Sequence, residues 1–308
     1  MSMILGNKYK IKNITDLCSG NGLQNPEIRI PEIKASMRFW WRALNFFNNS
    51  KEMKVKEEEI FGGSGKITCK SPLVFKLGEK NNFKVSDNKH IVKRDCNKEY
   101  TISCFKSGKT IDIELEFKKR KIDNNSFLCK GLEFYDSLFR ISLILGGIGK
   151  RSRRGCGVFN IANEEDKSNI VYKIEKYMKS LDVDKYYVFE NENFSFFKIY
   201  RKEEFKRKSG EYPYIEEILI DLNAIEEEEF YKKIKEAIDK AREGKLKYKN
   251  RGRLACPIYV TCYGEKDMLY PIIVKLHNTE LIEEDKILNR KYNDYYKVFK
   301  DVILCKRK

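Results

Sequence analysis

The stretch LEFYDSLFRISLILGGIGKRSRRGCGVFNI, residues 132–161, decides the fold of this chain. Residues 132–145 are apolar on nearly every side, which predicts a deeply buried helix. Five glycines then follow with four basic residues between them, and residues 156–161 return to the pattern of a strand. The sequence therefore predicts a buried helix that leads through a basic, glycine-rich loop into a strand.

Upstream segments supply the rest of this unit. Residues 9–14 alternate apolar and basic side chains, which predicts a half-buried strand. Residues 30–48 repeat apolar side chains at three- and four-residue spacing behind Pro31, which predicts an amphipathic helix. Residues 71–77 and 110–117 are predicted strands. The order strand, helix, strand, strand, helix, strand is that of the ferredoxin-like split unit, a four-stranded antiparallel sheet with two helices on one face.

The second half of the chain repeats these elements in a looser order. We expect an acidic helix at 164–181, strands at 186–189 and 194–200, a helix at 225–241, a hairpin of strands at 254–262 and 268–276, and a helix at 281–302. We therefore predict an α+β protein of two tandem ferredoxin-like (RRM-like) domains, residues 1–162 and 163–308, the second degenerate. Residues 78–104 are polar, and we interpret them as an insertion or long loop with strand character near 100–105.

Positive charge is concentrated in the first half of the chain. The 308 residues carry a net charge of +16, of which residues 1–160 contribute +14 and the remainder +2. Clustered lysine and arginine favour a polyanion, because neutralising phosphates releases counterions. The asymmetry indicates a nucleic-acid-binding surface; the alternative is that the extra charge only aids solubility.

Composition argues against membrane, secreted and metal-binding proteins. The longest apolar stretch, residues 141–148, is far below the roughly 18 residues of a spanning helix, and no charged-then-apolar leader opens the chain. The nine cysteines are scattered without a C-x-x-C pair, and only two histidines accompany them. We expect a cytoplasmic protein with reduced core thiols, no metal, no cofactor and no membrane contact.

The glycine-rich loop, residues 146–157, is the strongest candidate for a binding site. Glycine permits positive φ and lets backbone N–H groups approach an anion, so the loop is interpreted as a phosphate clamp. In a P-loop, G-x-x-x-x-G-K-[ST], the first glycine stands six positions before the lysine, and Ser or Thr follows it. Lys150 has neither, so the loop is not a P-loop. The alternative is a tight turn whose arginines pair with acidic residues of the same domain. The predicted RNA-binding residues of the loop are Gly147, Gly149, Lys150, Arg151, Arg153 and Arg154.

A second basic cluster lies on the helix at 30–48. Lys34, Arg38 and Arg42 form one row at i, i+4 and i+8, and a row of like charges needs an anionic partner. RNA and the carboxylates of residues 57–59 are the two possible partners, and the sequence leaves both open. The other predicted RNA-binding residues are Arg29, Arg251 and Arg253.

Candidates for catalysis are sparse. A general acid or base is most often a histidine, but neither His90 nor His277 lies in a motif or a plausible acid–base pair, so both are interpreted as ordinary polar residues. Asp16 is interpreted as a turn-capping residue. The adjacent Trp40 and Trp41 are interpreted as packing residues, one central and one at a flank, because neighbours on a helix point about 100° apart. We predict no catalytic residue and no enzymatic activity.

Three segments resemble the RAMP superfamily of CRISPR proteins, and within it the first subunit of the type III-B Cmr effector complex. The specific one is EIRIPEIKASMRFWWRAL at 27–44, followed by the E-x-x-I-F-G pattern at 57–62. The glycine-rich loop at 146–157 is typical of RAMP proteins in general. RGRLACPIYV at 251–260 is similar to a strand of the family's C-terminal domain.

The resemblance implies two ferredoxin-like domains in a non-catalytic RNA-binding subunit. Such a subunit caps the effector filament near the 3′ end of the guide RNA and helps capture target RNA in antiviral defence. The implied partners are guide CRISPR RNA, target RNA and the other RAMP subunits of the Cmr complex. One alternative is a RAMP-type guide-RNA-processing endoribonuclease, which usually needs a histidine beside the first helix and the loop, where this sequence has none. Another is a nonspecific nucleic-acid compacting protein, which would need neither two buried domains nor the 27–44 helix.

Overall fold

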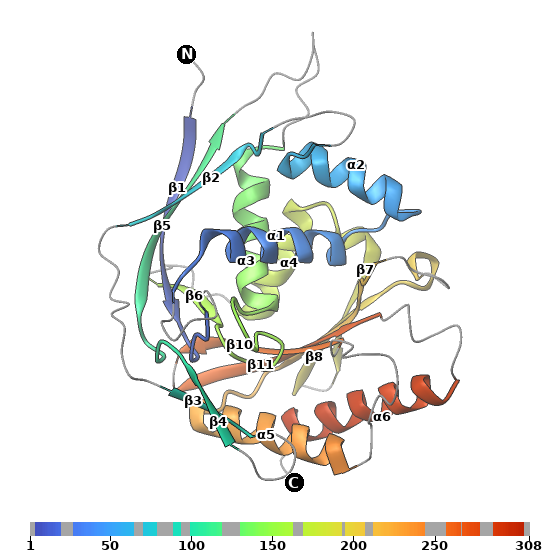
Figure 1. The fold of residues 1–308 in the computed structure, drawn as a ribbon. Coiled ribbons are helices and arrows are strands. Elements are labelled where there is room, and N and C mark those ends of the chain that lie inside the picture. Colours follow the sequence, from blue (N-terminus) through green and yellow to red (C-terminus); the bar gives the residue numbers. More distant parts are fainter. Residues whose placement is uncertain are drawn as a thin grey trace.

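The computed structural model shows an α+β protein, as predicted, with two larger antiparallel sheets and helices packed between and outside them (Figure 1). The structure describes residues 4–19, 27–64, 70–78, 89–93, 99–118, 130–162, 169–192, 195–206, 212–243, 257–265, 267–277 and 286–304.

The first sheet has the strand succession that the sequence predicts. Its strands are β1 (Ile4–Asn13), β2 (Leu73–Leu77), β5 (Thr110–Lys118) and β6 (Phe159–Ala162). They lie in the spatial order β2-β5-β1-β6, and each neighbouring pair is antiparallel. The alternation of apolar residues along β1 and β5 places their buried side chains on one face, where the helices cover them.

Helices α1 (Ile30–Leu44) and α3 (Leu132–Leu145) cover that face of the first sheet (Figure 1). Pro31 stands in the first turn of α1, where its missing N–H costs nothing. Helix α2 (Ser50–Phe61) was not predicted, because most of its side chains are charged or exposed and its apolar periodicity is weak. Asn49, whose side chain accepts a hydrogen bond from the Glu52 amide at 2.9 Å, is the N-cap signal that marks its start.

A separate two-stranded sheet lies within the polar segment 78–104. It pairs β3 (Lys89–Lys93) with β4 (Glu99–Ser103) in antiparallel register. Strand β4 confirms the expected strand character near residues 100–105.

The second sheet has five antiparallel strands in the order β10-β11-β9-β8-β7. They are β7 (Tyr187–Glu192), β8 (Phe196–Arg201), β9 (Ile215–Asp221), β10 (Ile258–Glu265) and β11 (Met268–Leu276). The β10–β11 hairpin confirms the prediction for this region. Strand β9 was not predicted, and it forms the centre of the sheet.

Three further helices complete the layers. Helix α4 (Ile170–Ser180) lies beside α3 between the two sheets, and α5 (Glu227–Glu243) and α6 (Lys286–Ile303) lie side by side on the far face of the second sheet (Figure 1). Two short 3₁₀ helices, η2 (Asp184–Tyr186) and η3 (Glu203–Phe205), flank β7 and β8. The molecule therefore stacks sheet, helices, sheet and helices.

The second sheet is buried on both faces. Along β9, Ile218 and Ile220 enter the same apolar cluster as α1 and α3, whereas Leu219 enters the cluster with α5 and α6. Ile272 and Ile273 of β11 divide in the same way. One apolar cluster thus runs across position 162, and the division into domains 1–162 and 163–308 stays a prediction.

Both tryptophans are buried, with Trp40 1% and Trp41 3% exposed. Trp40 packs edge-on against Tyr259 of the second sheet, and Trp41 packs against Phe61 of α2. The interpretation of both tryptophans as packing residues is confirmed, with Trp41 on the flank of α1 that α2 covers.

The C-terminal end of α1 is held by a buried arginine. The guanidinium of Arg201, 1% exposed, donates to the carbonyls of Ala43 and Leu44 at 3.0 and 3.2 Å. It also bonds the hydroxyl of Tyr187, and burial raises the pKa of that tyrosine to about 12. The last carbonyls of a helix lack intrahelical partners and carry partial negative charge, so Arg201 fixes α1 to the second sheet.

Candidate nucleic-acid interface

The glycine-rich loop (residues 146–157) joins α3 to β6 at the junction of the two sheets. The Lys150 amide donates to the carbonyl of Cys18 at 2.6 Å, and the Gly157 amide donates to the carbonyl of Asp16 at 2.8 Å. On the other side, the Val260 amide of β10 donates to the carbonyl of Arg153 at 3.1 Å. The loop is therefore bonded to the segment that follows β1 and to β10 of the second sheet.

The glycines of the loop are needed for close backbone packing. A Cβ on Gly147 would lie 2.1 Å from the carbonyl oxygen of Cys156. Gly157 has φ of 68°, and a Cβ there would lie 2.0 Å from the carbonyl oxygen of Ile148. The fold alone accounts for these two glycines, and the expected part of Gly147 and Gly149 in RNA binding stays a prediction.

Several loop amides are already used inside the protein. The N–H groups of Ile148, Lys150, Arg154, Cys156 and Gly157 all donate to protein carbonyls. These five amides are therefore already paired within the protein, and the phosphate-clamp interpretation of the loop stays a prediction.

The four basic side chains of the loop differ in their surroundings. Lys150 is exposed, whereas Arg151, Arg153 and Arg154 are half-buried. Arg153 lies with its guanidinium carbon 5.0 Å from the centre of the Tyr259 ring. Arg151 has a φ of 64°, which is uncommon for a residue with a side chain, and its buried Nε has no hydrogen-bond partner.

Three of these side chains lack, among the described residues, the acidic partners that the alternative interpretation requires. Within the described part of the chain, no ion pair joins Lys150, Arg151 or Arg154 to a carboxylate. The alternative of a turn whose arginines pair with acidic residues is therefore not supported for these three side chains within the described residues.

The basic row on α1 has internal partners. Arg42 makes a two-point contact with the carboxylate of Glu57 at 2.8 and 3.0 Å, and Arg38 reaches the same carboxylate at 3.4 Å. Arg38 also donates to the carbonyl of Gly62 at 3.1 Å, and Lys34 donates to that of Leu73 at 3.3 Å. Of the two partners that the sequence leaves open, the structure provides the carboxylate, and only from Glu57.

The remaining predicted RNA-binding residues lie elsewhere. Arg29 is half-buried at the N-cap of α1. Arg251 and Arg253 lie outside the described residues.

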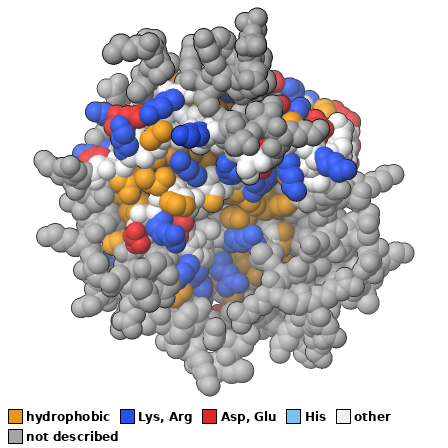
Figure 2. Space-filling model, turned by 45° about the horizontal axis from the view of Figure 1, so that its top comes forward, with side chains coloured by type: hydrophobic (Ala, Val, Ile, Leu, Met, Phe, Trp, Pro, Cys, Tyr) orange, Lys and Arg blue, Asp and Glu red, His pale blue; other side chains and the backbone are white. Residues whose placement is uncertain are grey.

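Lysine and arginine side chains recur across the described surface of the face in Figure 2, with hydrophobic side chains between them.

Asp16 is buried behind the loop, where it is 6% exposed. Its carboxylate accepts from the ammonium of Lys106 at 3.0 Å, and its amide donates to the hydroxyl of Tyr231 at 2.8 Å. This ion pair joins residues 90 positions apart in the sequence, and the turn-capping role of Asp16 stays a prediction.

The described cysteines behave as core thiols. Cys18, Cys104, Cys156 and Cys262 are free and buried. Contacts with Cys104 and Cys156, together with burial, raise the pKa of the Cys18 thiol, so this group stays protonated and unreactive. The other cysteines lie outside the described residues.

His277 has a carboxylate partner that the sequence did not reveal. Its Nδ1 lies 2.6 Å from Oε1 of Glu216, whose Oε2 contacts the ammonium of Lys275 at 2.9 Å. Burial by itself would raise the pKa of Glu216, but the contacts with His277 and Lys275 lower it to about 2. The expectation that His277 lacks an acid–base pair is wrong, because Glu216 lies on the unpredicted strand β9. His277 is only 7% exposed and stacks on Tyr214, as a structural residue does.

The described residues contain no cluster of three or more His, Cys, Asp and Glu side chains suited to a metal ion. None of the helices in these described segments is both long and apolar enough to cross a bilayer.

Comparison with known proteins identifies the fold and a match to one family model. The chain is similar to Cmr1 from Pyrococcus furiosus, at 16% identity over 96% of each chain and a TM-score of 0.53. It is also similar to a chain of type III-B Cmr-beta bound to cognate target RNA, at 12% identity over 96% of this chain and 99% of that one, again with a TM-score of 0.53. At these identities the likeness establishes the fold. No curated protein matches the sequence. The RAMP superfamily model matches residues 10–160, a segment that runs from within β1 into β6 and includes α1, α3 and the glycine-rich loop.

Proposed function

We propose that the chain is a non-catalytic RNA-binding subunit of a type III-B CRISPR effector complex. In this proposal it caps the effector filament near the 3′ end of the guide RNA and helps capture target RNA in the cytoplasm. Its partners are guide CRISPR RNA, target RNA and the other RAMP subunits of the complex. The match of residues 10–160 to the RAMP superfamily model and the similarity to a chain of Cmr-beta bound to cognate target RNA support this assignment.

The observation that carries the proposal is the anchored basic loop. Its backbone is bonded to the segment after β1 and to β10, and Lys150, Arg151 and Arg154 have no acidic partners among the described residues. A protein that used these residues only for a turn would not need to hold three uncompensated cations at one junction.

The sheet orders support two ferredoxin-like units within residues 1–162 and 163–308. The first sheet follows the split-unit succession β2-β5-β1-β6. In the second, β10-β11-β9-β8 has the same spatial order, with β8 in the position of the last strand although it precedes β9 in the chain. We infer that this permutation is what makes the second unit look degenerate in the sequence.

RNA recognition in this proposal goes through phosphates, with little base preference. The face of the first sheet that no helix covers pairs Lys8 with Glu114 and Lys10 with Asp112 across β1 and β5. Such a charged ladder stabilises the sheet and differs from the stacking aromatics of an RRM-type surface.

The contact between His277 and Glu216 is the one observation that favours the endoribonuclease alternative. A histidine held by a carboxylate is a common general base. Its burial and the stacked Tyr214 argue against contact with a substrate.

One experiment separates the two functions. The purified chain is mixed with single-stranded RNA and with guide precursor, and both binding and cleavage are followed at several salt concentrations. We expect binding whose affinity falls steeply with salt, with no cleavage. Tight binding that salt barely changes contradicts the phosphate mode, and cleavage that is lost in His277→Gln establishes the enzyme.

A further inference from the structure

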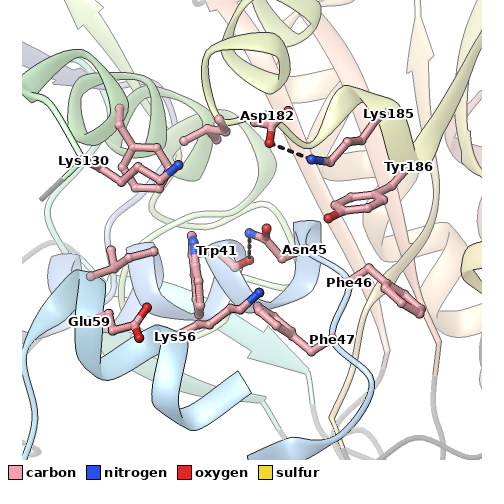
Figure 3. Close-up of a pocket in the computed structure, with 13 residues that line it drawn as sticks. Trp41, Asn45, Phe46, Phe47, Lys56, Glu59, Lys130, Asp182, Lys185 and Tyr186 are labelled. Carbon is pink, nitrogen blue, oxygen red and sulfur yellow. Dashed lines mark hydrogen bonds and ion pairs between the residues drawn. The ribbon is translucent and has the colours of Figure 1, made fainter. Parts of the chain in front are cut away.

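A cavity of about 400 Å³ opens between the helices, away from the glycine-rich loop (Figure 3). It is lined by the end of α1, by α2, by the start of α3 and by the turn after α4. Its volume falls in the range of roughly 300–1,000 Å³ that small-molecule sites occupy.

Basic side chains from three separate segments meet at this cavity. Lys56 comes from α2, Lys130 precedes α3, and Lys185 lies in η2 (Figure 3). Lys56 and Lys130 are exposed, and the Lys185 side chain keeps 50% of its surface exposed. Two carboxylates, Glu59 and Asp182, also line the cavity, and the Lys56 ammonium contacts Glu52 at 3.2 Å. The lining therefore has an excess of one positive charge, which suits a phosphate.

Aromatic rings form another side of the cavity. Tyr186 packs edge-on against Phe205 with ring centres 4.9 Å apart, and Phe46 lies 6.1 Å from Tyr186. Phe46 and Tyr186 line the cavity and are half-buried, so part of each ring stays accessible. Such rings are suited to stacking with a nucleobase.

Asp182 shows backbone strain at the edge of this cavity. It follows the end of α4 with a φ of 57°, a conformation in which glycine is normally found. The hydrogen bond from its amide to the carbonyl of Lys179, 2.9 Å long, is one that glycine would make equally well. Its carboxylate contacts the ammonium of Lys185 at 2.6 Å, so the side chain holds Lys185 in place at the cost of strain, as at many functional sites.

We propose that this cavity binds one nucleotide, with the base against Tyr186 and Phe46 and the phosphate among Lys56, Lys130 and Lys185. Asp182 acts as a positioning residue for Lys185. The inference rests on the proposed function in one respect, since it takes an RNA strand as the source of the nucleotide.

The test measures binding of AMP and of hexa-adenylate to the full chain by isothermal titration. We expect the double variant Lys130→Ala and Lys185→Ala to weaken AMP binding at least tenfold. Lys179→Ala, at the end of the same helix α4 but outside the cavity, is the matched control and keeps wild-type affinity. Unchanged AMP affinity in the double variant overturns the proposal.

Asp182→Gly separates a positioning role from a structural one. Relief of the strain raises the melting temperature, while loss of the carboxylate weakens AMP binding severalfold. A raised melting temperature with unchanged AMP affinity contradicts the role of Asp182.

Competition identifies the source of the nucleotide. Displacement of AMP by hexa-adenylate supports an RNA strand, and AMP binding that hexa-adenylate does not displace contradicts it. Substituting the four basic residues of the glycine-rich loop tests the proposed function separately: that variant keeps its AMP affinity even where its RNA affinity falls.

Discussion

In the sequence, the row Lys34, Arg38 and Arg42 and the basic glycine-rich loop are both short runs of closely spaced cations. In the fold, Glu57 reaches two members of the row, whereas Lys150, Arg151 and Arg154 of the loop have no described acidic partner. The row lies on α1, and the loop lies next to the same helix, since Gly146 of the loop packs against Trp40. The difference teaches that a run of cations indicates a binding surface only when it is known which of them are paired with carboxylates of the same protein.

Arg201 is the extreme case of an internally used cation and should give the largest effect. Replacing it with methionine fills similar volume but leaves the carbonyls at the end of α1 unpaired. We expect the free energy of unfolding to fall by about 4 kcal/mol, measured by urea denaturation. Lys202→Met, at the next position, should change it by less than about 0.5 kcal/mol. Equal effects of the two substitutions would show that the bonds from Arg201 to the end of α1 do not stabilise the fold.

Glu216, a carboxylate paired inside the protein, should make the stability of the fold depend on pH. Its pKa in the folded chain is about 2, below the value of 4.5 for an unperturbed carboxylate. A lowered folded-state pKa stabilises the protein above pH 4.5, and this contribution, about 3 kcal/mol, is lost as the pH falls from 4.5 toward 2. Denaturation midpoints across this range should decline steeply in the wild type and less steeply in Glu216→Gln. Parallel curves would contradict the assignment.

The loop should give an effect on RNA binding with almost none on stability. Replacing Lys150, Arg151, Arg153 and Arg154 by alanine should flatten the plot of log affinity against log salt by about 0.7 per lost phosphate contact, or roughly 2 to 3 in total. The melting temperature should stay nearly constant. Alanine at Lys179, Lys232, Lys235 and Lys240 removes the same charge elsewhere and controls for net charge. If the loop variant keeps its affinity and salt slope, the loop serves the turn alone.

Glu57→Gln should give the smallest effect. In contrast to the loop variant, it should lower the stability of the fold and leave RNA affinity unchanged. The two arginines lose their carboxylate, but their side chains are 39% and 31% exposed and regain water. We therefore expect a loss of about 1 kcal/mol in the free energy of unfolding and unchanged RNA affinity. The surface pair partner Glu175, replaced by glutamine, is the control. Weakened RNA binding without destabilisation would place the row on α1 among the RNA contacts.

Local periodicity explains how much of the fold was predictable. Strands β1 and β5 alternate in polarity, and α1 and α3 repeat apolar residues at helical spacing, so each was found without tertiary information. Helix α2 is too charged to show a buried face. Strand β9 has a run of buried residues, Ile218 to Asp221, rather than alternation, because both faces of its sheet are covered.

The sequence could predict which residue types make up the candidate site, but not which of their polar groups are already paired within the protein. The sequence by itself determined where positive charge, glycine and buried apolar residues lie along the chain, because these are properties of single residues and their near neighbours. Only the tertiary structure decided which polar groups are already paired. Arg42 meets Glu57 from an adjacent helix, and His277 meets Glu216 from a strand 61 residues away. A hydrogen bond or ion pair forms within about 3 to 4 Å, and that distance between remote residues is set by how sheets and helices pack.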